Sequence, residues 1–283
     1  MTIINLAQGR EPLRPAPWPW TDDTAMALSI CAVLAKYGGI DEDQLARSFS
    51  QRYAAQPRRG YGPAMHRLLP QLRDGKTRHK AARGLFGGQG SFGNGSAMRV
   101  APVGAFFADD LDATIEHARR SALVTHTHPE GIAGAIAVAV AAAWAWRLRG
   151  AVPPRPEEFL DLVLASIPTS EVAAWTRQAR NLAASRAPLR AVVDAVGNGS
   201  EVSCQDTVPF VLWSAAQNLG NYEEALWQTV SGLGDMDTTC AMVGGIVALY
   251  TGLDGIPEHW RRDREPLPEW FTQSVLGICL RSP

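Results

Sequence analysis

Two short acidic clusters stand out because each directly precedes a long apolar stretch. The cluster Thr21-Asp22-Asp23-Thr24 comes before one such stretch, and Asp235-Met236-Asp237-Thr238 comes before another near the far end of the chain. Acidic and hydroxyl residues are favoured at a helix N-terminus, so either cluster taken alone could simply cap a helix. A cap needs only one side chain, however, and adjacent carboxylates repel each other. Two clusters with the same residue types therefore suggest a shared chemical role.

Four carboxylates would converge if the two following helices packed side by side. So much negative charge is unfavourable in a partly buried site unless cations offset it. All the available donors are oxygen atoms, which favours a hard divalent ion: Mg²⁺ or Mn²⁺, with Ca²⁺ as a further option. Four acids predict two ions, roughly 3.5–4 Å apart, rather than one. The catalytic candidates are Asp22, Asp23, Asp235 and Asp237.

A glycine-rich segment, residues 84–102, is the second candidate site. Six glycines fall within residues 84–95, a density that is costly unless the backbone needs positive φ or a close approach to another group. The alternative is a flexible surface loop. The segment has no Walker motif and follows no strand, yet successive backbone N–H groups in such a turn can bind phosphate. Arg99 could add a positive charge there or serve as a structural ion-pair partner.

Two histidines lie just before an alanine-rich stretch, in the sequence Thr125-His126-Thr127-His128-Pro129. A zinc site would need a third nitrogen or sulfur ligand, and no cysteine or histidine lies at a useful spacing. The alternative is one helix cap and one solvent-facing ring. We interpret His126 as a polar contact in a pocket and His128 as structural.

The elements that position these residues are expected to be helical nearly throughout. Apolar residues recur at helical spacing, glycine and proline clusters separate the segments, and none alternates with period two, so almost no sheet is expected. No linker or repeat divides the chain, which predicts a single all-α domain over residues 1–283. Helices are expected at residues 22–36, 41–53, 62–73, 110–124, 129–148, 156–166, 170–183, 187–196, 206–218, 221–231 and 238–251.

Composition excludes several classes of protein. Hydrophobic residues make up 46% and charged residues 19%, and 27 basic against 28 acidic residues give a net charge of −1, which argues against a nucleic-acid binder. Residues 131–146 are uncharged but fewer than the roughly 20 needed to span a bilayer, so they predict a buried helix and no membrane role. The dispersed cysteines predict buried thiols, and no secretory signal is visible, so we expect a cytoplasmic protein. These cysteines are Cys31, Cys204, Cys240 and Cys279.

Four motifs occur in an order that resembles the ADP-ribosylglycohydrolase family. They are Thr21-Asp22-Asp23-Thr24, Gly93–Arg99, Thr125-His126 and Gly234–Thr238, and the resemblance runs from about Trp20 to Trp260. The family includes the dinitrogenase-reductase-activating glycohydrolase and the ADP-ribosyl-arginine and ADP-ribosyl-serine hydrolases. The resemblance implies an orthogonal all-α bundle with a central binuclear magnesium centre.

The resemblance also implies roles for individual residues. The metal ligands it implies are Thr21, Asp22, Asp23, Asp235, Asp237 and Thr238. The substrate-binding residues it implies are Gly62, Ser91, Phe92, Gly93, Asn94, Gly95, Met98, Arg99 and His126. Within that set, the loop 91–95 would hold the diphosphate and the distal ribose, with Phe92 stacked on adenine. His126 would lie near the diphosphate, and Gly62 would offer a backbone contact.

The chain departs from the family pattern in two places. No Gly-rich first helix with a Gly-Asp-Ala-Leu-Gly motif precedes Thr21, and no flap glutamate follows such a helix, so residues 1–19 are expected to be irregular. Glu11 is the only acidic residue before Thr21. Met236 stands where the family usually has a small polar residue. We expect its side chain to point away from the ions, so that the ligand set survives.

These features predict metal-dependent hydrolysis of the glycosidic bond between ADP-ribose and an acceptor, with protein arginine as the first choice. Two Mg²⁺ ions, or Mn²⁺ in their place, would orient the ribose hydroxyls, and an aspartate would take the proton of the attacking water. Serine-linked and small-molecule ADP-ribosyl compounds are alternative substrates. A non-catalytic ADP-ribose-binding relative and a helical scaffold whose acids act only as caps are alternative functions.

Overall fold

The chain is all-helical in the computed structural model, which describes residues 10, 15–74 and 77–273. Within these residues there is no strand, only two isolated bridges. The predicted all-α class is therefore confirmed. Most of the segment 1–19, including Glu11, lies outside the described residues, and so does Cys279; residues 15–19 carry no helix.

Every helix expected from the sequence forms, with ends within a few residues of the prediction. They are α2 (Asp22–Tyr37), α3 (Glu42–Ala55), α4 (Pro63–Arg73), α7 (Leu111–Leu123), α8 (Pro129–Arg147), α9 (Pro156–Leu164), α10 (Glu171–Ala184), α11 (Leu189–Val196), α12 (Cys204–Gln217), α13 (Tyr222–Ser231) and α14 (Met236–Thr251). Shorter helices were not expected, because a turn or two has too few residues to show a period. These are α5 (Arg78–Arg83), η1 (Leu85–Gly88), η2 (Asn94–Ser96), α6 (Ala101–Phe106), η3 (Leu253–Gly255) and α15 (Glu258–Asp263).

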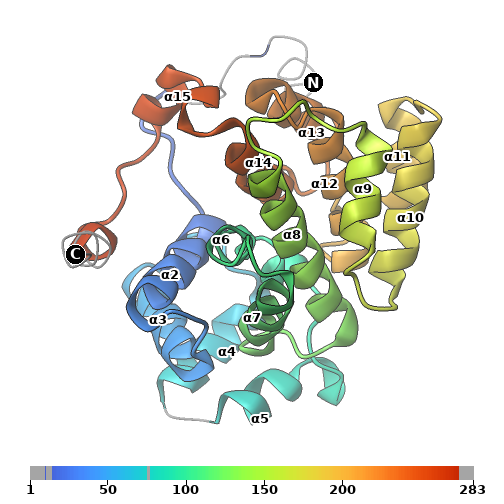
Figure 1. The fold of residues 1–283 in the computed structure, drawn as a ribbon. Helices are drawn as coiled ribbons and strands as arrows, with labels where there is room; N and C mark the ends of the chain where they lie inside the picture. Colours follow the sequence, from blue (N-terminus) through green and yellow to red (C-terminus); the bar gives the residue numbers. More distant parts are fainter. Residues whose placement is uncertain (1–9, 11–14, 75–76, 274–283) are drawn as a thin grey trace.

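The alanine-rich helix α8 is the centre of the bundle. Figure 1 shows it running through the middle, with α2–α4 on one side and α9–α11 on the other. It contacts α6, α7, α9, α12 and α14, and most of its residues are buried. By length and composition it could cross a membrane, but core helices of soluble proteins pass the same test, and this one is enclosed by other helices. Small side chains on every face allow this close packing.

Two glycines allow neighbouring helices to pack closely against α8. A Cβ on Gly104 of α6 would lie 2.1 Å from the carbonyl oxygen of Ala139. A Cβ on Gly134 of α8 would lie 2.5 Å from Sγ of Cys204, the first residue of α12. Both contacts help to position the glycine-rich segment, because α6 follows it in the chain and α12 begins beside it. The core therefore fixes that segment from two sides.

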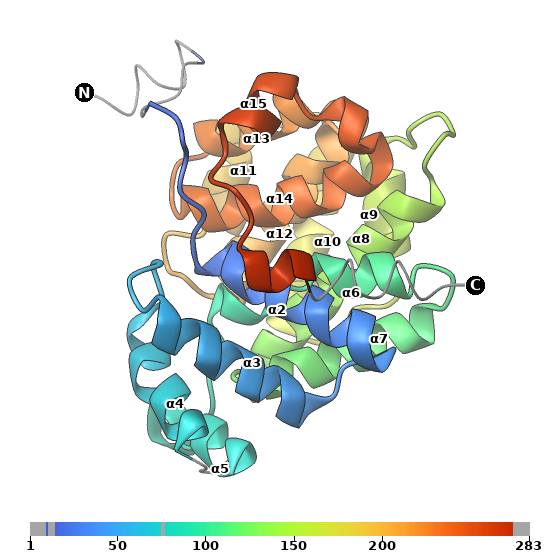
Figure 2. The same cartoon turned by 90° about the vertical axis from the view of Figure 1, so that its left-hand side faces the viewer.

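The acidic ends of α2 and α14 belong to neighbouring helices, which contact each other across the bundle (Figure 2). The start of α2 is anchored to a distant part of the chain. The backbone of Trp18 exchanges hydrogen bonds of 2.8 Å with Asp263 and Glu265. The Arg59 guanidinium donates to the Glu265 carboxylate and to the carbonyl oxygen of Trp20. These bonds hold the chain where it enters α2.

Replacing Gly104 by alanine should destabilise the fold. The new methyl would overlap the Ala139 carbonyl, and overpacking of this kind costs about 1–3 kcal/mol of the free energy of unfolding. Denaturant unfolding followed by circular dichroism measures the loss. Gly62→Ala is the matched control, because no atom lies within 4 Å of its Cβ position. Equal stability of the two variants would contradict the close contact between α6 and α8.

Candidate active site

The acidic clusters do not cap the helices that they precede. Thr21 and Asp235 occupy the N-cap positions of α2 and α14, and neither makes a side-chain capping hydrogen bond. Elsewhere the chain caps its helices in the ordinary way, through the side chains of Asp41, Asp110 and Ser170. The alternative in which these acids are merely caps therefore loses its structural basis.

The side chains of the clusters bond to neutral donors, and one oxygen has no partner. The Thr21 hydroxyl donates to Oδ2 of Asp23 at 2.5 Å, and Nδ2 of Asn94 donates to Oδ2 of Asp235 at 2.8 Å. Oδ1 of Asp23 is buried, with no hydrogen-bond partner in the described part of the chain. An unpaired buried carboxylate oxygen is costly, and a cation is the partner best able to remove that cost.

The aspartates at the two ends of the chain are close enough to perturb each other. Burial, followed by the charge of Asp23, raises the pKa of Asp22 to about 7, and Asp237 and Asp235 add to the rise. Burial raises the pKa of Asp23 to about 6 against the Thr21 hydrogen bond, and Asp237 again contributes. Burial also raises the pKa of Asp235, with the Asn94 hydrogen bond opposing and Asp237 assisting. The carboxylates of α2 and α14 thus share one electrostatic site.

The donor chemistry of this site fits a hard divalent cation. It offers carboxylates from both helices, the hydroxyl of Thr21 and the buried hydroxyl of Thr238. No three acidic, histidine or cysteine side chains stand at metal-ligand spacing within the described ranges. Asp23 and Asp235 accept hydrogen bonds from Thr21 and Asn94. Asp22 and Asp23 are buried whereas Asp237 is exposed, so the site opens to solvent on the α14 side.

The glycine-rich segment is held on both sides. The N–H of Cys204 donates to the carbonyl of Phe92 at 2.9 Å, and the N–H of Asn94 donates to the carbonyl of Val202 at 3.1 Å. The Ser96 hydroxyl donates to the carbonyl of Gly131 in α8 at 2.7 Å. Gly90 has a positive φ of 78°, and a Cβ there would lie 2.1 Å from Oγ1 of Thr127. The segment is therefore held in place by the core rather than forming a loose surface loop.

Asn94 joins this surface to the acidic site. Its amide nitrogen reaches both Asp235 and, at 3.2 Å, the hydroxyl of Thr207 on α12. Gly199, with a φ of 92°, also lies against the acidic site, because a Cβ there would lie 3.1 Å from Cβ of Asp235. Sequence reasoning missed Thr207 and Gly199. The only signal was the turn-forming pair Asn198-Gly199, which does not indicate what it faces.

The two histidines differ in role. Nδ1 of His126 lies 2.7 Å from the Thr125 hydroxyl, and its Nε2 would lie 3.2 Å from a Cβ on Gly95, so the ring faces the loop 91–95. Nδ1 of His128 accepts from the N–H of Glu130 and caps α8, and its ring contacts Phe92 at a centroid distance of 5.3 Å. The cap made by His128 agrees with the structural role expected for it, and the pocket role of His126 stays a prediction.

Three other expected substrate residues lie apart from the loop surface. Arg99 is fully buried, and its guanidinium donates to the carbonyl of Ser121. Met98 lines a cleft of about 660 Å³ that begins at Asp23 and runs between α2, α6 and α14. Gly62 is the N-cap of α4. Gly60, two residues earlier, lies closer to the acidic site, because a Cβ on Gly60 would lie 3.1 Å from Oδ1 of Asp22.

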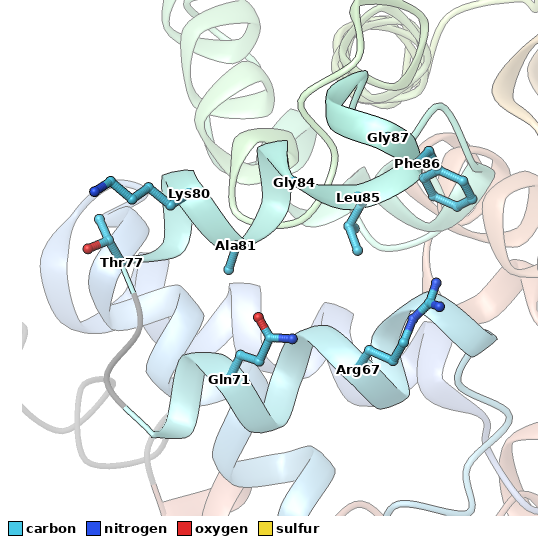
Figure 3. A pocket seen from close by; sticks show the side chains of 9 residues that line it. All are labelled: Arg67, Gln71, Thr77, Lys80, Ala81, Gly84, Leu85, Phe86 and Gly87. Atoms are coloured by element: carbon cyan, nitrogen blue, oxygen red, sulfur yellow. The ribbon is translucent and has the colours of Figure 1, made fainter.

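An exposed aromatic pair marks the other end of the loop. Phe86 and Phe92 are 52% and 38% exposed, with ring centroids 6.3 Å apart and planes tilted by 33°. The sequence reasoning did not single out Phe86, since no motif surrounds it. Figure 3 shows Phe86 bordering a second cleft, about 830 Å³ in volume, together with Leu85 and Arg67. No aspartate lines that cleft, so it is not the acidic site.

The class of protein to which this all-helical bundle belongs is shown by comparison of its sequence with known families. Residues 3–280 match the sequence model of the ADP-ribosylglycohydrolases. The chain belongs to the ADP-ribosylglycohydrolase family. The resemblance noted from the motifs alone is thereby confirmed.

Several relatives are ADP-ribosylhydrolases by name. The chain is 31% identical to human ADP-ribosylhydrolase ARH3 over 281 residues, which cover 88% of this chain and 76% of that protein. It is 33% identical to ARH3 of Xenopus tropicalis, covering 87% and 77%. It is 26% identical to the ADP-ribosylarginine hydrolase Tri1 of Pseudomonas putida, covering 91% and 65%. A solved ADP-ribosylglycohydrolase-related protein complex shares the fold, with a TM-score of 0.62, 24% identity and coverage of 93% and 82%.

The raised pKa values predict how stability depends on pH when divalent ions are removed by a chelator. With folded-state pKa values of about 7 and 6, Asp22 and Asp23 bind more protons folded than unfolded. Taken alone, these two carboxyls should therefore lower the free energy of unfolding as the pH rises from about 4 to about 7. His126 acts in the opposite direction, because burial lowers its pKa to about 3. The carboxyl contribution is therefore read, in chelator, as the difference in melting temperature between the wild type and a variant that lacks one of the two carboxyls.

The matching substitution is Asp22→Asn, which removes one of the interacting charges. In chelator at neutral pH this variant should melt higher than the wild type, and the difference should shrink as the pH falls toward about 4. Asp254→Asn is the control, since that side chain is exposed. An Asp22→Asn variant that melts below the wild type at neutral pH would contradict the assigned repulsion.

Proposed function

We propose that this protein hydrolyses the bond between ADP-ribose and an arginine side chain of a modified protein. The observation that carries the proposal is the shared site formed by the aspartates of α2 and α14, joined through Asn94 to the glycine-rich loop. Family membership supports ADP-ribose as the substrate group. The Pseudomonas relative, whose name specifies ADP-ribosylarginine, supports arginine as the acceptor.

The site has a place for each part of ADP-ribose. The aromatic rings of Phe86 and Phe92 are exposed and suit the adenine, because a base gains stacking energy on such faces. The N–H groups of Gly93 and Asn94 already donate to Ser91 and Val202. The remaining backbone N–H groups of loop 91–95 and the ring of His126 suit the diphosphate. The acidic site beyond Asn94 then receives the ribose that carries the acceptor.

The aspartates would bind the cations and would also accept a proton. Thr21, Asp22, Asp23, Asp235, Asp237 and Thr238 would hold two Mg²⁺ ions, or Mn²⁺ in their place. Such ions, when bound, orient the ribose hydroxyls and lower the pKa of a nearby water. As the bond to the acceptor breaks, the sugar gains positive charge, which the surrounding carboxylates stabilise. One aspartate accepts the proton of the attacking water.

Removal of either end of the acidic site should abolish turnover. Asp22→Ala and Asp237→Ala should each lower kcat for arginine-linked ADP-ribosyl protein by at least about 100-fold and weaken Mg²⁺ binding, because both helices contribute to one site. The helical circular dichroism spectrum should be largely unchanged. Asp254→Ala is the control on an exposed aspartate. Near-native hydrolysis by either test variant would refute the assignment.

The acceptor is decided by parallel assays with arginine-linked and serine-linked ADP-ribosyl peptides. The proposal expects faster release of ADP-ribose from the arginine-linked peptide in the presence of Mg²⁺. Faster release from the serine-linked peptide would overturn the acceptor and keep the glycohydrolase. Saturable ADP-ribose binding without release from either peptide would identify a non-catalytic binder instead.

The aromatic pair makes a separate prediction about binding. Phe86→Ala and Phe92→Ala should each raise KM about tenfold and change kcat little, because the base lies far from the bond that breaks. Trp175→Ala is the matched control, because it removes a 38% exposed aromatic ring on α10, away from the loop. Steady-state kinetics separate the two constants. Wild-type KM values in both phenylalanine variants would refute the proposal that adenine binds on these rings.

A further inference from the structure

A buried arginine stands directly behind the loop that we assign to the diphosphate. Arg99 is fully buried, and no carboxylate forms a direct ion pair with it within the described residues, although burial lowers its pKa and the more distant charge of Asp22 opposes that effect. Its guanidinium lies 4.5 Å from the ring centroid of Phe49, and Nη2 donates to the carbonyl of Ser121 at 2.9 Å and to the hydroxyl of Thr125 at 2.8 Å. A buried charge of this kind is costly. Its contact with Thr125 points to what the charge does.

The hydrogen bonds of Thr125 have only one direction that satisfies every group. A guanidinium donates and never accepts, so the Thr125 oxygen must be the acceptor in its bond with Arg99. The hydroxyl hydrogen then needs an acceptor of its own, and Nδ1 of His126 lies 2.7 Å away. No other bond of this hydroxyl occurs in the part of the chain that the structure describes. Nδ1 therefore accepts, and in a neutral ring the hydrogen must sit on Nε2.

The free edge of that ring faces the loop. Nε2 of His126 would lie 3.6 Å from a Cβ on Gly93, an ordinary contact, and 3.2 Å from one on Gly95, which is a tight contact that favours glycine there. The described residues offer Nε2 no hydrogen-bond partner of their own. An N–H donor is thus aimed at the surface formed by loop 91–95.

We propose that Arg99 and Thr125 act as positioning residues that fix His126 as an Nε2–H donor toward the phosphate groups of the ligand. This inference rests on the proposed function only for the identity of the ligand, the diphosphate of ADP-ribose. Arg99 then affects ligand binding through Thr125 and His126 without touching the ligand. A direct ligand contact was expected from its position beside the glycines in the sequence. Burial and the neighbouring Arg99 charge also lower the pKa of His126 to about 3, which keeps the ring neutral.

The tautomer is measured by NMR on the full-length chain with ¹⁵N-labelled histidine and no ligand, with the His126 signals assigned from the His126→Asn variant. The wild type should show a neutral ring with the hydrogen on Nε2 alone. Thr125→Val removes the hydroxyl at nearly constant volume and should introduce an Nδ1–H population. Thr125→Ser should restore the wild-type pattern. Thr127→Val, at a hydroxyl with no hydrogen-bond partner, is the matched control.

Binding of ADP-ribose by calorimetry is the second readout. Thr125→Val and Arg99→Met should each weaken binding about tenfold, the value of roughly one hydrogen bond to a charged group. Thr125→Ser and Thr127→Val should stay within about twofold of the wild type. If Arg99→Met does not fold, the Thr125 variants still decide the question.

Two results would overturn the proposal. One is a wild-type His126 that carries its hydrogen on Nδ1 or carries two hydrogens. The other is a Thr125→Val variant that keeps both the pure Nε2–H signal and wild-type affinity. A wild-type chain that fails to bind ADP-ribose would refute the proposed function, while the NMR result on the free protein would still decide how His126 is held.

Discussion

Repulsion between carboxylates at two helix N-termini is the constraint that organises this molecule. Asp22 and Asp23 are buried at the start of α2, within electrostatic reach of Asp235 and Asp237 at the start of α14. The partial positive charge of each helix end offsets part of the cost. A buried Asp23 oxygen without a partner shows that the offset is incomplete. We propose that divalent cations offset the remaining cost, while the rest of the bundle keeps the two helix ends together.

The same framework connects the acids to the ligand surface. The central helix α8 brings the glycine-rich segment against α12 through contacts that only glycine permits, and Asn94 then spans from that segment to Asp235. Behind the loop, Arg99 and Thr125 orient His126. At its far end, Phe86 and Phe92 present exposed rings. The exposed rings, the glycine-rich loop and the acidic centre therefore follow one another in the order in which we propose that they bind the base, the diphosphate and the acceptor-bearing ribose of ADP-ribose.

The sequence predicted the long helices well because their apolar residues recur with helical period, and it identified the acidic clusters because paired aspartates exceed what a cap needs. It could not place residues whose role depends on distant neighbours. Arg99 sits beside glycines in sequence, which suggests a ligand contact, yet its side chain turns into the core behind His126. Phe86 and Thr207 carry no local pattern, and only the folded chain brings them to Phe92 and Asn94.

The most direct test of the shared acidic site is electron paramagnetic resonance of the protein loaded with Mn²⁺. Two ions held together by the aspartates of α2 and α14, about 3.5–4 Å apart, would be magnetically coupled. The account predicts a coupled spectrum at saturation. A spectrum of isolated Mn²⁺ ions at every loading, or of free Mn²⁺ alone, would contradict it.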